Sequence, residues 1–169
     1  MPAPTLKQIE VVRDAFARSR ITEHALPDLA PGQVLARIDT FALTANNVSY
    51  AVSGDMLGYW RFFPCPEPWG VLPVWGFATV VRSRCEALAE GERIWGFLPM
   101  ASHAVLEPGE VSERGFADVA AHRQGLADVY NRYQRTRADP PELAGLEAER
   151  SALVPLFTTS FMIDDFLAD

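Results

Sequence analysis

The chain has 169 residues, of which 49% are apolar and 22% charged, and its formal net charge is −7 at pH 7. This length fits one domain of roughly 150 residues with a core that needs no staple, which excludes a disulfide-linked miniprotein, a fibre and a disordered tail. An acidic surface repels phosphate backbones, so we expect no nucleic-acid partner.

Short strands are predicted in the first two thirds of the chain. Residues 33–39 alternate between apolar and polar side chains after the turn signal Pro31-Gly32. Further strands are predicted at residues 77–83, 92–98 and 103–106. The connections are too short for crossover helices, so the pattern indicates a small barrel or sandwich and not a parallel sheet.

Residues 107–150 are denser in charge than the rest of the chain, which predicts a surface excursion. A helical spacing within it predicts one helix, built on Leu126, Val129, Tyr130 and Tyr133. The tyrosines are interpreted as packing residues. Asp139 before Pro140-Pro141 predicts the N-cap of a second helix that ends near Arg150.

The last segment, residues 155–169, predicts a helix of a different kind. Its apolar side chains spread around most of the helix circumference, so the face of one barrel could not cover all of them. Such a helix needs two partners. We therefore expect a neighbour that is missing from this polypeptide, either a further domain or a partner subunit, with a homodimer as one form.

Several motifs together resemble a known family. Residues 31–38, 41–47 and 75–81 and the stretch EGERIWGF at 90–97 follow the order of the N-terminal, GroES-like domain of the medium-chain dehydrogenase/reductase superfamily. The strings FALTANNVSYA, YWRFFP, VWGFA, YNRY and PLFTTSFMIDDFL are similar to an uncharacterised bacterial branch of that superfamily, carried as a domain of unknown function.

The resemblance implies a fold class and a domain layout. It implies a mainly β chain with peripheral helices (α+β): a GroES-like, partly open β-barrel with a C-terminal helix leading into a Rossmann domain. Residues 1–150 would form the barrel domain with a charged helical excursion at about 107–150, and residues 151–169 the linking helix. The nucleotide-binding domain that would hold NADPH is expected to be absent from this chain.

Metal chemistry is not expected. The resemblance places Ala45 and Trp75 where zinc-dependent relatives carry a cysteine and a histidine, and neither residue can ligate zinc. Cys65 and Cys85 lie 20 residues apart without a CxxC motif, and the three histidines are scattered. The implied relatives are therefore zinc-independent quinone and enoyl reductases, in which hydride passes from NADPH to a polarised alkene or carbonyl.

The resemblance also implies site residues. Asn47 stands where dehydrogenases carry a residue that contacts the substrate oxygen, and Tyr50 where some carry a relay histidine, so these two are the candidate catalytic residues. Both can donate hydrogen bonds to a developing enolate. Further residues are candidates for substrate or cofactor binding: Asn46, Tyr59, Trp60, Phe62 and Trp75. A structural alternative stays open for each group, as a turn for the asparagines and as core or a barrel cap for the aromatics.

The function expected from these features is the substrate-binding domain of a zinc-independent, NADPH-linked oxidoreductase that acts on a small apolar carbonyl compound and is inactive in isolation. Two alternatives remain: an interaction or scaffold module that dimerises through the C-terminal helix, and a small-molecule binder without chemistry. The sequence lacks a membrane-length apolar run and the pattern of a signal peptide, so a cytoplasmic protein without membrane contact is expected.

Overall fold

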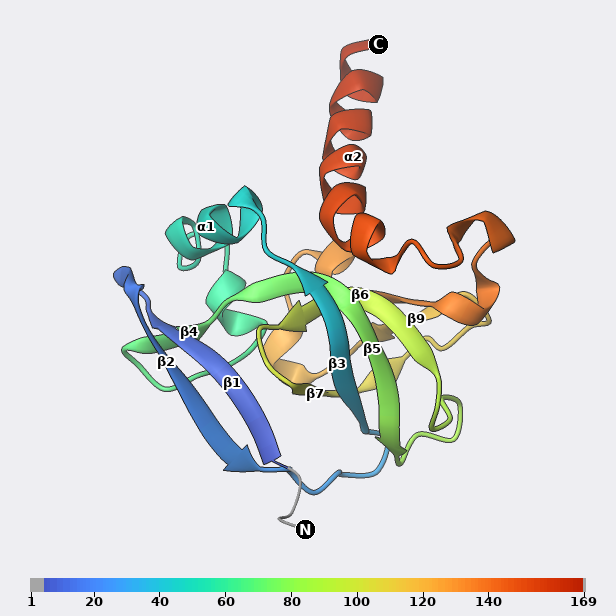
Figure 1. Ribbon diagram of the computed structural model, residues 1–169, viewed down its shortest axis with the longest axis horizontal. Helices are drawn as coiled ribbons and strands as arrows, with labels where there is room; N and C mark the ends of the chain where they lie inside the picture. The colour runs from blue at the N-terminus through green and yellow to red at the C-terminus, as the bar shows by residue number, and fades with distance from the viewer. Residues whose placement is uncertain (1–4, 169) are drawn as a thin grey trace.

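The computed structural model describes residues 5–168 as two antiparallel sheets and two α-helices (Figure 1). The smaller sheet has the order β2-β1-β4, with strands Ala15–Ala25, Thr5–Val12 and Trp69–Val71. The larger sheet has the order β7-β3-β5-β6-β10-β9-β8. Its strands are, in that order, His103–Leu106, Val34–Ala42, Pro73–Ser83, Arg93–Pro99, Arg132–Arg135, Gly115–Asp118 and Pro108–Gly109.

The larger sheet curls into a nearly closed barrel. Strands β7 and β8 lie at opposite ends of the strand order, yet only Glu107 separates them in the chain. The two ends must therefore meet, and the backbone N–H of Val119 donates to the carbonyl of Glu107 at this seam, over 2.9 Å. The smaller sheet joins at the β7 end, where the N–H of Ile9 donates to the carbonyl of Met100.

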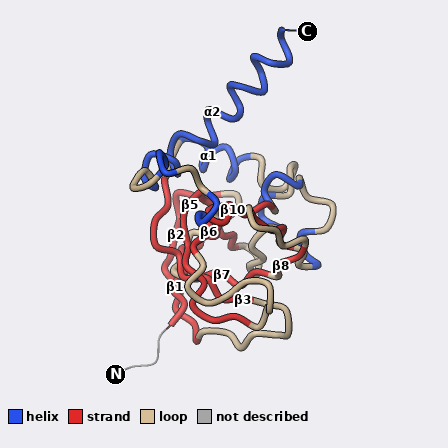
Figure 2. Tube along the Cα trace, turned by 90° about the vertical axis from the view of Figure 1, so that its right-hand side faces the viewer, coloured by secondary structure: helices blue, strands red, loops and turns tan. Residues whose placement is uncertain are grey.

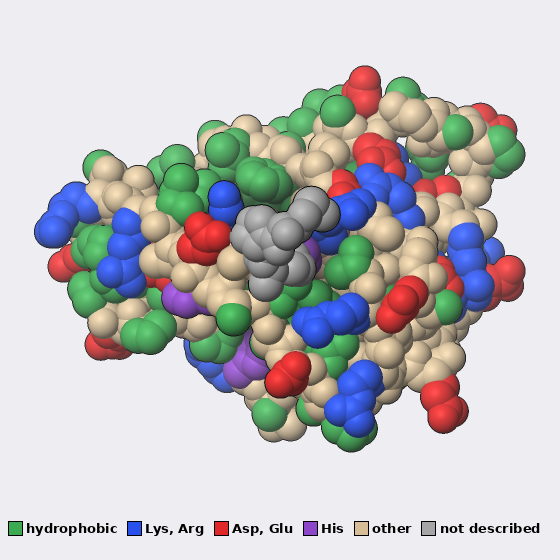
Figure 3. Space-filling view, turned by 60° about the horizontal axis from the view of Figure 1, so that its bottom comes forward, with side chains coloured by type: hydrophobic (Ala, Val, Ile, Leu, Met, Phe, Trp, Pro, Cys, Tyr) green, Lys and Arg blue, Asp and Glu red, His purple; other side chains and the backbone are tan. Residues whose placement is uncertain are grey.

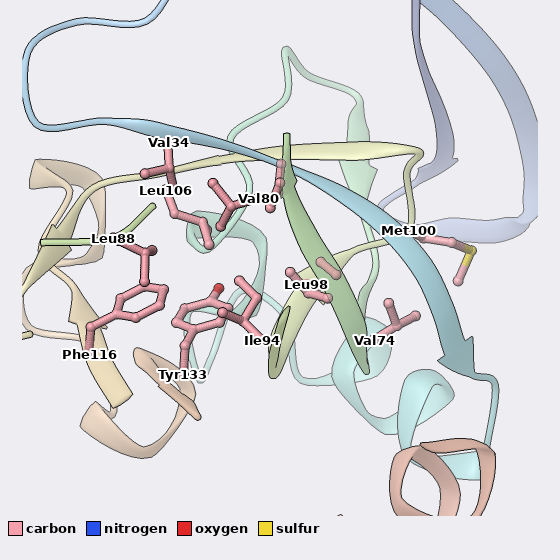
Figure 4. Close-up of a cluster of buried hydrophobic side chains, with 13 residues drawn as sticks. Val34, Val74, Val80, Leu88, Ile94, Leu98, Met100, Leu106, Phe116 and Tyr133 are labelled. Atoms are coloured by element: carbon pink, nitrogen blue, oxygen red, sulfur yellow. The ribbon is translucent and has the colours of Figure 1, made fainter. Parts of the chain in front are cut away.

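The barrel interior holds one continuous apolar core. Figure 4 shows side chains from the barrel strands converging there, among them Val34, Val80, Ile94 and Leu106. The rings of Phe116 and Tyr133 stack in the same core, with centroids 5.2 Å apart. The mainly β fold class, with a partly open barrel and a C-terminal helix, is therefore confirmed.

The four strands expected from alternation are present as β3, β5, β6 and β7, and residues 103–106 match β7 in full. The hairpin of β1 and β2 is an addition that alternation did not indicate. Its turn at Arg13-Asp14 lacks glycine and proline, and β2 is exposed along most of its length. The turn between these strands therefore carries no signal in the sequence, and β2 has no buried face to mark it.

The expectation of a helical surface excursion at residues 107–150 is wrong for most of its length. Residues 126–133 form a one-turn 3-10 helix, Asp128–Tyr130, and then strand β10. The segment contributes β8, β9 and β10 to the barrel, and its charge is partly internal, since Asp118 and Arg123 are both buried and lie 2.9 Å apart. The helix expected from Asp139 is a single 3-10 turn, Pro141–Leu143.

The remaining helical elements are α1, Ala45–Val52, α2, Glu147–Ala168, and further 3-10 turns at Tyr59–Arg61, Ala121–Arg123 and Thr136–Ala138. Helix α2 includes the terminal helix expected from the sequence, whose last residue, Asp169, lies outside the described residues. Its first turns pack on β3 and β5, and the rest extends away from the barrel (Figures 1 and 2).

The face shown in Figure 3 carries basic and acidic side chains interspersed, without a region of one sign. Within residues 5–168, no helix combines the length and the apolar character that a membrane crossing requires.

Candidate functional site

A groove of about 770 Å³ lies between α2 and the open end of the barrel. This volume falls in the range of small-molecule sites. The barrel side is lined by side chains from α1, β5, β6 and the segment before β10, chiefly Asn46, Tyr50, Trp75, Trp95 and Tyr130. The opposite side is lined by α2. The lining is therefore mostly aromatic and aliphatic, with a few polar groups.

Two tryptophans form a flat wall of this groove. Trp75 on β5 and Trp95 on β6 stack with ring centroids 4.8 Å apart and planes 24° apart. Tyr130 lies beside them, with its centroid 6.0 Å from that of Trp75. Planar ligands bind well against surfaces of this kind because aromatic rings favour offset stacking.

Beneath the wall, an aromatic cluster fixes the rings that reach the groove. Tyr50 packs edge-on against Phe97, with centroids 5.4 Å apart, and lies 4.7 Å from the ring of Tyr59. Phe62 is buried behind them and contacts both Phe97 and Tyr130. Close packing of this kind leaves little rotational freedom, so the hydroxyl groups that the cluster carries have fixed positions.

Three tyrosine hydroxyls meet at this point. The indole Nε1–H of Trp75 donates to the Tyr50 hydroxyl over 3.2 Å. The hydroxyls of Tyr59 and Tyr130 lie 3.0 Å apart and share a hydrogen bond. The groove thus has phenol hydroxyl groups at its aromatic end, and its α2 side is mostly apolar.

The surroundings keep these phenols protonated. Burial raises the pKa of Tyr50, and contact with Tyr130 adds to the rise. Burial also raises the pKa of Tyr130. Both hydroxyls are therefore donors throughout the physiological pH range.

Asn47 is a structural residue. Its Oδ1 accepts the backbone N–H of Thr44 over 2.7 Å, and its Nδ2 donates to the carbonyl of Pro73 over 2.7 Å. The first bond completes a capping box at the start of α1. Each end of the amide makes one of these bonds, the residue is buried, and it does not line the groove, so the contacts that the structure shows for Asn47 are those of a helix cap.

Two more expected site residues do not line the groove. Trp60 packs against Val11 and Ala51 and fills the space beside Gly54 and Gly70. Phe62 is 1% exposed and supports the cluster from behind. Among the expected residues, the structure brings Asn46, Tyr50 and Trp75 to the groove, with Tyr59 directly behind them.

The sequence reasoning missed Trp95, Gln134 and the role of Tyr130. Trp95 lies opposite Phe77 across β5 and β6 and lines the groove. This pairing register of the two strands cannot be read from the sequence. The helical spacing that Tyr130 shares with three other apolar residues predicts a packing role for it. The string YNRY, which carries part of the family resemblance, was the one signal available.

The α2 side of the groove is built from two adjacent rows of side chains. Val154, Thr158 and Met162 form one row at intervals of four residues, and Pro155, Thr159 and Ile163 form the other. The hydroxyl of Thr159 donates to the carbonyl of Pro155, so this residue offers mainly its methyl group to the groove.

The groove does not fit a dinucleotide. A pyrophosphate needs several cationic or backbone N–H donors, whereas the single charged residue among those that line the groove is Arg132. Its guanidinium is already paired with Asp128 and Glu110. Across residues 5–168, no cluster of three or more metal-ligating His, Cys, Asp or Glu side chains occurs.

Two solved structures show limited similarity to this chain. One is a protein designated an NADPH:quinone reductase from Bacillus thuringiensis, with a TM-score of 0.45 and 9% identity over 75% of this chain and 36% of that one. The other is the quinone oxidoreductase from Coxiella burnetii, with a TM-score of 0.41 and 11% identity over 64% of this chain and 39% of that one. The chain thus spans less than two fifths of the length of either.

A search of curated proteins gave no match. A family model, described as "Protein of unknown function (DUF2855)", matches residues 41–169, which include α1, β4, the barrel strands from β5 onwards and α2. The match covers well over half of the sequence, and the chain therefore belongs to the DUF2855 family.

Proposed function

We propose that this chain is the GroES-like, substrate-binding domain of a zinc-independent, NADPH-linked oxidoreductase, and that the groove takes a flat apolar compound with a conjugated carbonyl group. The observation that carries the proposal is the combination of the Trp75–Trp95 wall with the hydroxyl of Tyr50 at the same end of one groove. The family motifs in the sequence support the same assignment.

The role proposed for Tyr50 follows from its hydrogen bonding. Its oxygen accepts a bond from Trp75, so its own proton remains available for a ligand oxygen. In a reduction, negative charge develops on the carbonyl oxygen, and a positioned O–H donor stabilises that charge. NADPH would supply the hydride, but the groove holds no site for its phosphates, so the groove is proposed as the substrate site alone.

Binding of a matched ligand pair tests the proposal. Menadione is a flat dicarbonyl compound, and 2-methylnaphthalene has the same ring system without the oxygens. We expect the 169-residue chain to bind menadione more tightly, and Tyr50→Phe to weaken that binding by roughly 3- to 10-fold, the usual value of one hydrogen bond. Isothermal titration calorimetry measures both affinities.

The fourth tyrosine of the chain provides the control, since Tyr133 lies in the barrel core and not in the groove. Tyr133→Phe should leave the preference for menadione over the hydrocarbon intact. Equal binding of the two compounds by the unmodified chain would reject the proposed site. NADPH oxidation by menadione should show no acceleration when this chain alone is added.

A second function is favoured by one observation on α2. Phe157 and Phe161 stack with centroids 6.4 Å apart, are largely exposed and do not line the groove. A second copy of the chain, pairing through this part of α2, is the interaction module that we propose as the alternative. Sedimentation equilibrium of the chain and of Phe161→Glu decides it: a dimer that the substitution dissociates supports the module, and a monomer in both cases rejects it.

A further inference from the structure

The geometry points to Tyr130 as a second oxygen-binding residue of the groove, with Tyr59 as the residue that orients its hydroxyl. This inference rests on the proposed carbonyl site. It narrows the ligand to planar compounds that carry an oxygen on the edge of the ring, where two phenol hydroxyls can donate hydrogen bonds to it. Tyr130 belongs to the YNRY segment, to which the sequence assigned packing alone.

The ring of Tyr130 is held on several sides. It lies 4.5 Å from the ring of Phe97, 5.4 Å from that of Tyr59 and 5.6 Å from that of Phe62, measured between centroids. The backbone is fixed as well, because Tyr130 ends a 3-10 turn and its carbonyl accepts from Arg123. The hydroxyl is therefore held in place, and the half-buried residue lines the groove.

The direction of the Tyr59–Tyr130 hydrogen bond follows from burial. Tyr59 is 8% exposed, and the one hydrogen-bond partner of its hydroxyl within the described chain is Tyr130. Either hydroxyl could donate in this pair. We assign the donor to Tyr59, because a buried hydroxyl that fails to donate costs free energy and no other acceptor for it lies within the described chain. This leaves the O–H of Tyr130 without an acceptor in its own pair and free for a ligand.

The hydroxyl of Tyr50 also has both an acceptor and a donor role. Its oxygen accepts from Trp75, and its proton is directed either to a ligand or to the neighbouring oxygen of Tyr130. In both arrangements the hydroxyl proton of Tyr130 has no acceptor among these three hydroxyls. Donation into the Tyr130 oxygen also polarises its O–H bond, because hydrogen bonds in a chain strengthen one another.

The two hydroxyls differ in what surrounds them, and this sets the ligand geometry. Tyr50 and Tyr130 meet edge-on, with ring planes 82° apart, and the ring of Trp75 lies beside Tyr130 with its plane tilted by 44°. A planar ring stacked on Trp75 would direct an oxygen on its edge toward both hydroxyls. A carbonyl oxygen has two lone pairs and can accept from both.

A thermodynamic cycle with the same ligand pair tests this role. We expect Tyr130→Phe to weaken menadione binding by roughly 3- to 10-fold and to leave 2-methylnaphthalene binding unchanged, because the substitution removes only the hydroxyl. Tyr59→Phe should give a smaller loss for menadione, since it removes the orienting bond, and again no change for the hydrocarbon. Equal losses for both ligands would assign Tyr130 to packing and overturn the inference.

The outcomes separate this inference from the proposed function. If the unmodified chain fails to prefer menadione, the carbonyl site itself is rejected. If it does prefer menadione, and Tyr130→Phe retains the full preference while Tyr50→Phe loses it, the inference alone is overturned. Thermal unfolding of each variant, with Tyr133→Phe as the matched control, shows that the losses come from folded protein.

Discussion

Neighbouring side chains near the groove have different roles, some in holding the fold and others in lining the groove. Asn46 and Asn47 are neighbours on α1, yet one lines the groove and the other caps the helix and bonds the carbonyl of Pro73. Sequence alone could not separate them, because asparagine suits both turns and ligand contacts. Tyr50 was identified from the family motif, whereas Tyr130 required knowledge of a partner 71 residues away.

Asn47→Ala should lower the free energy of unfolding by about 1–3 kcal/mol. The substitution removes the capping bond to Thr44 and leaves the carbonyl of Pro73 without its donor. Urea denaturation measures the change. Asn46→Ala is the control, and a loss of equal size in that variant would contradict the capping role of Asn47.

Glu10 makes stability depend on acidity. Burial opposes its ionisation, but hydrogen bonds from Arg20, Gln8 and Thr22 outweigh this effect and hold the pKa below its usual value of 4.5. A lowered folded-state pKa stabilises the protein above the unfolded-state value, and this contribution is lost as the pH falls through the folded-state value.

The expected result is a pH-dependent difference between the unmodified chain and Glu10→Gln. The variant should be less stable at about pH 7, and the difference in unfolding free energy should shrink below about pH 4.5. Urea midpoints across this range give the measurement. Glu67→Gln is the control because Glu67 is 85% exposed. A difference that stays constant across the whole range would refute the linkage.

At the scale of elements, the first turns of α2 are anchored to the barrel, and the rest of the helix extends away from it (Figure 1). Arg93 on β6 bonds both Glu147 and Asp39, and Arg150 bonds Asp139. The guanidinium groups of Arg93 and Arg150 also lie over the ring of Phe77. These contacts set the angle at which α2 leaves the barrel and thereby the width of the groove.

Arg93→Gln should loosen the first turn of α2 while leaving the barrel intact. The substitution removes the ion pairs to Glu147 and Asp39. We expect faster amide hydrogen exchange at residues 147–153 and unchanged exchange in β5 and β6, because local opening depends on local contacts. Arg61→Gln is a matched control remote from this network, and equal effects of the two variants would refute the anchoring role.

The elements differed in how well the sequence predicted them. Strands β3, β5, β6 and β7 are short apolar stretches that lie between turn signals, so their positions were predictable. Residues 126–133 were not, because their helical spacing is overridden by tertiary contacts. Tyr133 stacks on Phe116 across β9 and β10, and Tyr130 bonds Tyr59. Long-range pairing of this kind decides between helix and strand where local spacing is short.

For the whole molecule, the arrangement separates a closed core from an open groove. The barrel is filled by its own side chains (Figure 4), and Trp75, Trp95 and Tyr130 line the groove between its end and α2. The charge-rich segment at residues 107–150 closes the barrel, because it supplies β8, β9 and β10. Its buried arginines are paired with carboxylates, Arg123 with Asp118 and Arg135 with Glu92. The groove is therefore the feature through which this chain would meet a ligand.

A crystal structure of the chain with menadione tests the central claim most directly. We expect a planar ring stacked on Trp75, with one carbonyl oxygen about 2.5–3.0 Å from the hydroxyls of Tyr50 and Tyr130. Menadione bound elsewhere on the molecule, or seated in the groove with both oxygens turned away from these hydroxyls, would contradict it.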